Sequence, residues 1–205
     1  MCATRRTLPS THAVPATSSD EIVGARWLLY FACFVTGAST LVIELSGNRL
    51  LAPLFGNSML TWTSLIGVVL VAMSVGDVVG GALVDRAPRL SILGYILLAA
   101  AAWTLAVPLI HAWATTWAMT ERVIAGPMVA SAVLFAVPAC LLASASPFTI
   151  RLVSRITADH EIGLSAGVVG MFATLGSFVG TFLTGFVLIP QFGVRTIFVM
   201  TGLIE

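Results

Sequence analysis

Two acidic side chains lie inside apolar stretches of this chain, and their chemistry stands out first. Glu44 is part of FVTGASTLVIELSGNRLLAP, and Asp77 is part of VLVAMSVGDVVGG. A carboxylate among apolar neighbours is costly unless it holds a proton, a cation or a hydrogen-bond donor, so both acids are candidates for proton or cation binding. Asn48 follows Glu44 by one helical turn and is placed to share a hydrogen bond with it.

Each acid also has a purely structural interpretation. Glu44 is equally well explained as a protonated or hydrogen-bonded acid that only holds helices together. For Asp77, an acid that reaches toward the membrane boundary or caps a neighbouring backbone is slightly favoured over a ligand. We therefore treat Glu44, Asn48 and Asp77 as candidate substrate-binding residues whose structural alternative stays open.

A second set of residues points to helix packing and gating. Arg49 lies about 140° around the helix from Glu44, so its side chain is expected to extend to lipid headgroups rather than to pair with the acid. Glycines that recur at short intervals allow helices to approach closely. The candidates for structural or gating roles are Arg49, Pro53, Gly76, Gly80, Gly81, Asp85, Arg86, Arg89, Gly176 and Gly180.

The composition indicates which solvent must surround these residues. Of the 205 residues, 58% are hydrophobic and 9% are charged, and the mean hydropathy is +1.02. Soluble domains carry about 25% charged residues, so we expect the partner of this surface to be the lipid bilayer. The net charge is +1, which excludes the basic surface typical of nucleic-acid binding. The three cysteines have neither metal-ligand nor disulfide spacing, and we expect no catalytic residue, metal site or cofactor.

Five apolar stretches are long enough to cross a hydrocarbon core of about 30 Å as helices. Pro53 is predicted to stop the first of them, and three prolines predict that the fourth is bent or stops near Ser146. The fold class is therefore all-α, a polytopic transmembrane helix bundle with about five full spans and a truncated sixth. The predicted spans are about 27–51, 59–84, 90–112, 123–150 and 162–189.

The two ends of the chain differ from the spans between them. Residues 1–25 are rich in Ser, Thr, Ala and Pro without periodicity and are predicted to form a flexible cytoplasmic tail, which leaves 26–205 as the transmembrane domain. The sixth span begins near Arg195 and reaches Glu205 after about ten residues, half of a crossing. We expect from this that the sequence is incomplete, through truncation or an interrupted reading frame.

The arginines predict the orientation of the bundle. Cytoplasmic loops carry an excess of basic residues, so the side with more arginines is expected to face the cytoplasm. A cytoplasmic N-terminus leaves Arg49, Arg122 and Arg195 on the far side. The arginines on the cytoplasmic side are then Arg5, Arg6, Arg26, Arg86, Arg89, Arg151 and Arg155.

Several segments together carry a resemblance to a known family. The segments are FVTGASTLVIE, RLLAPLFGNS, GDVVGGALVDR, SPFTIRL and TLGSFVGTFLTGFVLIPQFG, and they resemble the membrane-embedded part of bacterial spermidine synthase-like proteins over about 31–198. The segment GALVDRAPR also resembles the loop after the second helix of major-facilitator transporters, where an acid and arginines form a cytoplasmic latch. The chain departs from the family's pattern at Asp77, where a small or hydroxylated residue is expected. The matching positions are Gly37, Glu44, Arg49, Leu50, Ala52, Pro53, Gly56, Gly80, Gly81, Asp85, Arg86, Pro147, Gly176, Gly180, Gly185 and Pro190.

The resemblance implies a function that this chain does not carry alone. In the family, a helical membrane segment precedes an aminopropyltransferase-like domain, which needs a glycine-rich turn after a strand. No such pattern follows Asp85, so we expect no enzyme activity from the chain as it stands. The resemblance implies a multi-pass protein of the bacterial inner (plasma) membrane that anchors, or supplies a polyamine substrate to, a catalytic domain or subunit.

Two other classes of function stay open. One is a half-size, major-facilitator-like transporter that moves a cationic or amphipathic solute as a homodimer, since six helices are half of that fold. The other is a structural membrane protein whose polar residues only fix packing.

Overall fold

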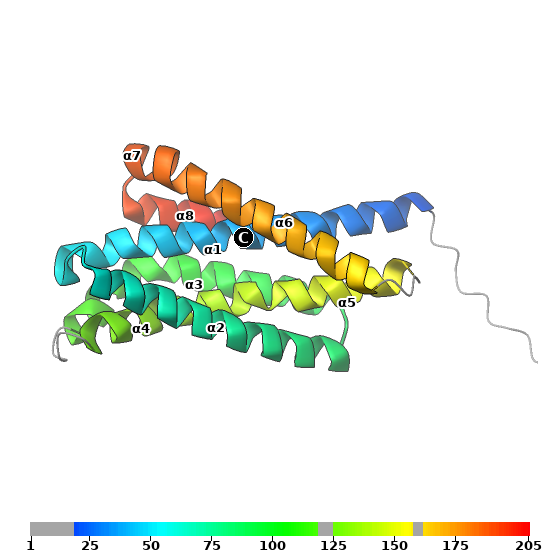
Figure 1. Cartoon of the computed structure of the whole chain (residues 1–205), viewed down its shortest axis with the longest axis horizontal. Helices are drawn as coiled ribbons and strands as arrows, with labels where there is room; N and C mark the ends of the chain where they lie inside the picture. Colours follow the sequence, from blue (N-terminus) through cyan, green and yellow to red (C-terminus); the bar gives the residue numbers. More distant parts are fainter. Residues whose placement is uncertain (1–18, 119–124, 158–161) are drawn as a thin grey trace, which may run out of the picture.

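The structure is a computed structural model, and it describes residues 19–118, 125–157 and 162–205. Over those ranges the chain is helical and contains no β-strand, so the predicted all-α bundle is confirmed (Figure 1). Five segments are long and apolar enough to cross a membrane, namely Val23–Phe55, Met59–Arg86, Leu90–Ala118, Ala125–Arg155 and Gly163–Gln191. The elements are α1 (Ser19–Phe55), α2 (Met59–Arg86), α3 (Leu90–Ala118), α4 (Ala125–Ala143), α5 (Ala145–Thr157), α6 (Ile162–Leu183), the π-helix η1 (Thr184–Leu188), α7 (Ile189–Gln191) and α8 (Val194–Ile204).

The first helix is longer than predicted at both ends. It begins at Ser19, inside the segment assigned to the tail, and residues 1–18 lie outside the described residues. Its other end passes through Pro53 and stops at Phe55, so the prediction that Pro53 ends the helix was wrong. A proline in the last turn removes a single backbone donor, and the chain turns only at Gly56, whose φ of 77° suits glycine. The next helix begins at once, because Ser58 accepts a hydrogen bond from the backbone N–H of Thr61.

The predicted interruption of the fourth span is present. Helix α4 ends at Ala143 and α5 begins at Ala145, with Ser144 between them. Pro147 cannot donate a backbone hydrogen bond to the preceding turn, and this lets the helix break there. The hydroxyl of Ser144 donates to the carbonyl oxygen of Leu141 at 2.6 Å and so satisfies one acceptor at the break.

The prolines also explain an element that was not predicted. Helix α6 widens into the π-helix η1 immediately before Pro190, and α7 then ends at Gln191. Because Pro190 has no N–H, the turn before it loses one helical bond, and a wider turn keeps the neighbouring carbonyls paired.

Helices α1 and α6 approach closely through small residues. Gly176 and Gly180 of α6 lie directly against the backbone of Phe34 and Ala38 in α1, and Gly37 of α1 lies against the backbone of Ala173 in α6. A side chain at any of these glycines would meet backbone atoms of the partner helix, which cannot rotate away. Figure 1 shows α6 crossing α1 along this contact.

Helices α2 and α4 form a second pair of the same kind. Gly76 lies against the backbone of Cys140, and Gly80 lies against Ser144, the residue between α4 and α5. Gly81 faces open space, because no atom lies within 4 Å of the position that a Cβ would take there, so it plays no part in this approach. The close-packing interpretation therefore describes Gly76, Gly80, Gly176 and Gly180 but not Gly81.

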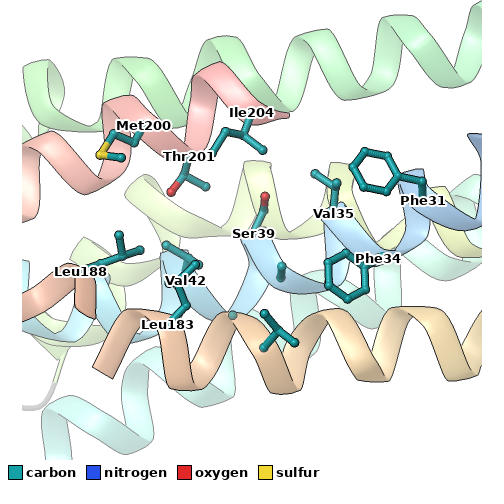
Figure 2. A pocket seen from close by; sticks show the side chains of 13 residues that line it. Phe31, Phe34, Val35, Ser39, Val42, Leu183, Leu188, Met200, Thr201 and Ile204 are labelled. Atoms are coloured by element: carbon teal, nitrogen blue, oxygen red, sulfur yellow. The ribbon is translucent and has the colours of Figure 1, made fainter. Parts of the chain in front are cut away.

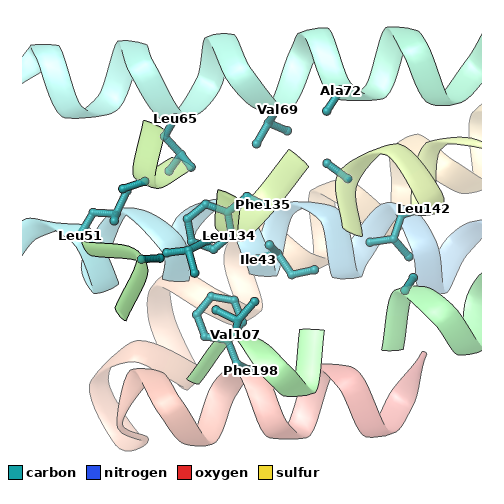
Figure 3. Packing of buried hydrophobic residues seen from close by; sticks show 14 of the residues in the cluster. Ile43, Leu51, Leu65, Val69, Ala72, Val107, Leu134, Phe135, Leu142 and Phe198 are labelled. Carbon is teal, nitrogen blue, oxygen red and sulfur yellow. The ribbon is translucent and has the colours of Figure 1, made fainter. Parts of the chain in front are cut away.

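The bundle interior is filled by interlocking apolar side chains. Phe135 of α4 stacks on Phe198 of α8, with ring centroids 6.1 Å apart, and Leu51, Leu65 and Val107 pack around them (Figure 3). A second cluster, which includes Leu29, Phe148 and Val169, fills the other half of the bundle. Helix α4 contributes to the first cluster and contacts α1, α2 and α3.

The outer surface is apolar as well. Val78, Tyr95 and Leu109 are 73%, 72% and 82% exposed, and they belong to helices long enough to span a bilayer. Soluble monomers rarely expose large apolar side chains over such an area. Several apolar helices with apolar outer faces indicate a membrane protein.

Candidate functional site

A polar cluster joins three helices inside the otherwise apolar bundle. Glu205, at the end of α8, lies between Thr104 of α3 and Ser39 of α1. The Thr104 hydroxyl is 3.1 Å from Glu205 Oε2, and Ser39 interacts with the same carboxyl group. The side chains of Ser39 and Thr104 are buried, so the cluster is largely shielded from the surrounding medium.

Among the described residues, the Glu205 carboxyl group has two hydroxyl donors near it, those of Ser39 and Thr104. Thr104 Oγ1 also lies 2.9 Å from the carbonyl oxygen of Ala100, and a hydroxyl has one proton for these two acceptors. The second carboxyl oxygen, Oε1 of Glu205, is buried and makes no hydrogen bond to the described residues. A proton on the carboxyl group, or an N–H from a bound cation, would give Glu205 Oε1 a hydrogen bond.

An apolar cavity of about 450 Å³ adjoins the cluster (Figure 2). It lies between α1, α6 and α8, and its walls include Phe31, Phe34 and Ile204. Ser39 lines the cavity and also contacts Glu205, so it connects the apolar space to the carboxyl group. The arrangement suits a small molecule that carries a hydrocarbon chain and one hydrogen-bond donor.

Glu44 and Asn48 are not joined in the structure. Glu44 is half-buried and makes no ion pair or hydrogen bond within the described ranges, and it does not line the cavity of Figure 2. The Asn48 amide donates instead to Asn57 Oδ1 at 3.4 Å, and Trp62 Nε1 donates to the same oxygen at 3.1 Å. Asn48 therefore connects α1 to the turn before α2 through Asn57.

Asp77 is the more exposed of the two predicted acids. It lies on α2, beside the pair of glycines that pack against α4, and its carboxylate is close enough to Cys140 of α4 to interact with it electrostatically. No hydrogen bond or ion pair holds the Asp77 carboxylate among the residues the structure covers. Asp77 also lies outside the cavity beside Glu205.

The predicted gating residues at the end of α2 include one ion pair. Asp85 Oδ1 is 3.5 Å from Arg151 Nε, and this contact joins α2 to α5. Both side chains are substantially exposed, and Arg86 and Arg89 nearby are exposed as well. The contact has the position of a latch between helices, although an exposed pair contributes little stability.

The opposite end of the bundle holds a second basic group. Arg49 and Pro53 of α1 line a pocket of about 480 Å³ together with His111 of α3 and Arg195 of α8. Arg49 thus lies near the end of α1 and lines this pocket. Arg122 lies outside the described residues.

The chain is similar to a curated protein, Polyamine aminopropyltransferase 1 of Streptomyces coelicolor. The two are 31% identical over 172 residues, which make up 83% of this chain and 30% of that protein. No family model and no solved structure matches the chain. The similarity supports a relation to spermidine synthase-like proteins, and this chain spans less than a third of the curated protein's length.

The sequence interpretation missed the cluster around Glu205. The signal was present, because Glu205 is an acid at the end of an apolar run, like Glu44 and Asp77. The same residue is the basis of the expectation that the sixth span is truncated, and local pattern cannot predict that Ser39 and Thr104 lie beside it. These residues lie on three helices, so only the packing of α1, α3 and α8 brings them together.

Proposed function

We propose that this chain is the membrane domain of a spermidine synthase-like protein and that it anchors, or supplies substrate to, an aminopropyltransferase-like catalytic domain. The observation that carries the proposal is the similarity to Polyamine aminopropyltransferase 1, which extends over 83% of a chain with five membrane-length helices. The proposal places aminopropyl transfer itself outside this chain, since donor binding of that kind uses strands with a glycine-rich turn.

The anchoring role rests on the apolar outer surface. Helices such as α2 and α3 present large apolar side chains to their surroundings, including Val78 and Leu109. In lipid these side chains need no further partner, and the backbone of each span is satisfied within its own helix. An attached soluble domain would be held at the membrane by these spans.

The arginines favour one orientation for such an anchor. Among the described arginines, Arg49 and Arg195 lie at the end of the bundle where α1 stops and α8 begins, while the others lie at the opposite end. We propose that the arginine-rich end faces the cytoplasm of a bacterial cell. The arginines at that end are Arg26, Arg86, Arg89, Arg151 and Arg155.

The supplying role would use the cavity beside Glu205. A polyamine combines short hydrocarbon segments with amino groups, and the cavity offers apolar walls next to the Glu205 carboxyl group. An N–H from the amine would meet Glu205 Oε1, which has no hydrogen bond within the described ranges. The hydrocarbon part would lie against residues such as Phe34 and Ile204.

Two assays test the two roles separately. A soluble reporter fused after Glu205 should stay with carbonate-washed membranes, and its release into the supernatant would refute anchoring. Spermidine should raise the melting temperature of the protein in detergent, and Glu205→Gln should remove this shift while Asp85→Asn keeps it. Asp85 is the matched control because it is an exposed acid at a bundle end.

The outcomes separate the competing functions. A shift that both variants keep would refute the supplying role at Glu205. Uptake of labelled spermidine into proteoliposomes beyond that of protein-free vesicles would favour the half-size transporter instead, and a dimer in detergent would support that alternative. Membrane retention with neither a shift nor uptake leaves the anchoring role standing on its own.

A further inference from the structure

A pocket at the end of the bundle gathers basic groups from three segments that are far apart in the sequence. Arg49 comes from the end of α1, His111 from the last part of α3, and Arg195 from the first turn of α8. The pocket has a volume of about 480 Å³, and no acidic residue is among the described residues that line it. Its location is distinct from the cavity beside Glu205, whose lining residues are all different.

The two arginines in this pocket have no partner within the described residues. Arg49 and Arg195 are exposed, and neither takes part in an ion pair or a hydrogen bond over the described ranges. Arg151, at the other end of the bundle, pairs with Asp85. Two guanidinium groups that line one pocket, with no carboxylate among its described lining residues, suit an anion, and their planar forks match phosphate oxygens.

His111 adds a third polar group with a defined orientation. Its Nδ1 lies 2.8 Å from the carbonyl oxygen of Pro108. Two lone pairs would repel at that distance, so Nδ1 carries the proton and donates to the carbonyl. The other ring nitrogen, Nε2, makes no hydrogen bond to the described residues and is available to a ligand.

The start of α8 contributes backbone donors to the same place. Gly193 precedes the helix in an extended conformation without a side-chain cap, and the first helical hydrogen bond runs from Ile197 N to the carbonyl oxygen of Gly193. The N–H groups of Val194, Arg195 and Thr196 therefore have no partner within the helix. These N–H groups lie at the positive end of the helix dipole, which adds to the positive charge of the arginines.

The pocket lies where membrane-length helices end, and it has an apolar side. Trp113 and Trp117 stack on each other just beyond His111, and tryptophans at the end of a span are typical of the membrane boundary. Leu50 and Leu54 form part of the wall beside Arg49. A group with a charged phosphate and an attached hydrocarbon part fits this combination.

We propose that Arg49, His111, Arg195 and the first turn of α8 form a binding site for a phosphate-bearing anion at this end of the bundle. The phosphate can belong to a lipid headgroup or to a free phosphate, and the chemistry of recognition is the same for both. The site is independent of the proposed polyamine cavity, because an arginine pair repels an amine.

The test compares two double variants in detergent. Arg49→Gln with Arg195→Gln removes the charge from the pocket, and Arg89→Gln with Arg155→Gln removes the same charge from exposed positions at the other end. Binding is measured by the shift in melting temperature with phosphatidylglycerol in mixed micelles and, separately, with inorganic phosphate at constant ionic strength. All four arginines are exposed, so both double variants should fold; if the pocket variant does not, Arg195→Gln alone replaces it.

The pocket variant should bind one probe roughly tenfold or more weakly than the parent, because charged hydrogen bonds are removed. The variant with the two arginines changed at the other end should bind like the parent. A loss for phosphatidylglycerol alone identifies a lipid site, and a loss for inorganic phosphate identifies a site for a soluble anion. An equal loss in both double variants would overturn the proposal, because it would reflect net charge alone. The absence of saturable binding of either probe to the parent would overturn it as well.

Discussion

Replacing Gly176 with alanine should separate α1 from α6. The added Cβ would meet the carbonyl oxygen of Phe34, a backbone atom held in place by its own helix. Overpacking of this kind costs about 1–3 kcal/mol, and alanine regains up to ~1 kcal/mol by its better helix propensity. With the full gain subtracted, the net expectation for Gly176→Ala is a loss of about 0–2 kcal/mol in the free energy of unfolding, and a loss of about 1–3 kcal/mol relative to an alanine that meets no neighbour.

The matched control lies on the same helix. Gly170 has no atom within 4 Å of the position of an added Cβ, so Gly170→Ala should be neutral or stabilise by up to ~1 kcal/mol. Unfolding is followed by tryptophan fluorescence while SDS is titrated into protein in non-ionic detergent, since the chain has five tryptophans. Phe34→Ala should not rescue Gly176→Ala, because the clash is with a backbone oxygen. Equal stability of the two glycine variants, or rescue by Phe34→Ala, would refute the reasoning.

Two further predictions concern charged groups. Asp85→Asn should lower the free energy of unfolding by less than ~1 kcal/mol, because the pair with Arg151 is exposed. The loss should vanish in about 1 M salt, which screens exposed charges. A larger loss that persists in salt would contradict this prediction. If Glu44 binds a cation, Glu44→Gln should abolish stabilisation by spermidine in a thermal-shift assay, and Asp77→Asn should do so if Asp77 binds it. An unchanged shift in both variants would leave each acid with a structural role only.

The prediction of the helices depended on information that is local in the chain. Long apolar runs define the five spans, because in hydrocarbon the backbone must form its hydrogen bonds within each segment. The errors lie at the ends, where α1 passes through Pro53 and begins at Ser19. Those boundaries depend on a single backbone bond or on the first turn outside the apolar run, which hydropathy describes poorly.

The candidate site was predicted less completely. Glu44 and Asp77 are recognisable because each is an acid among apolar neighbours. The proposed hydrogen bond between Glu44 and Asn48 is absent from the described residues, since Asn48 turns to Asn57 instead. Local spacing identifies residues on one helix face but cannot decide which of several partners a side chain takes.

By itself, the amino-acid sequence determined that this is an all-α bundle of membrane-length helices, and its motifs already pointed to spermidine synthase-like proteins. Glycine spacing also predicted helix faces that pack closely, since the absence of a Cβ lets any neighbouring helix approach. Only the tertiary structure decided that Gly176 meets Phe34, that Glu205 meets Thr104, and that Arg49 and Arg195 share a pocket. Each of these contacts joins segments far apart in the chain, and their meeting depends on how the helices pack, which no local pattern specifies.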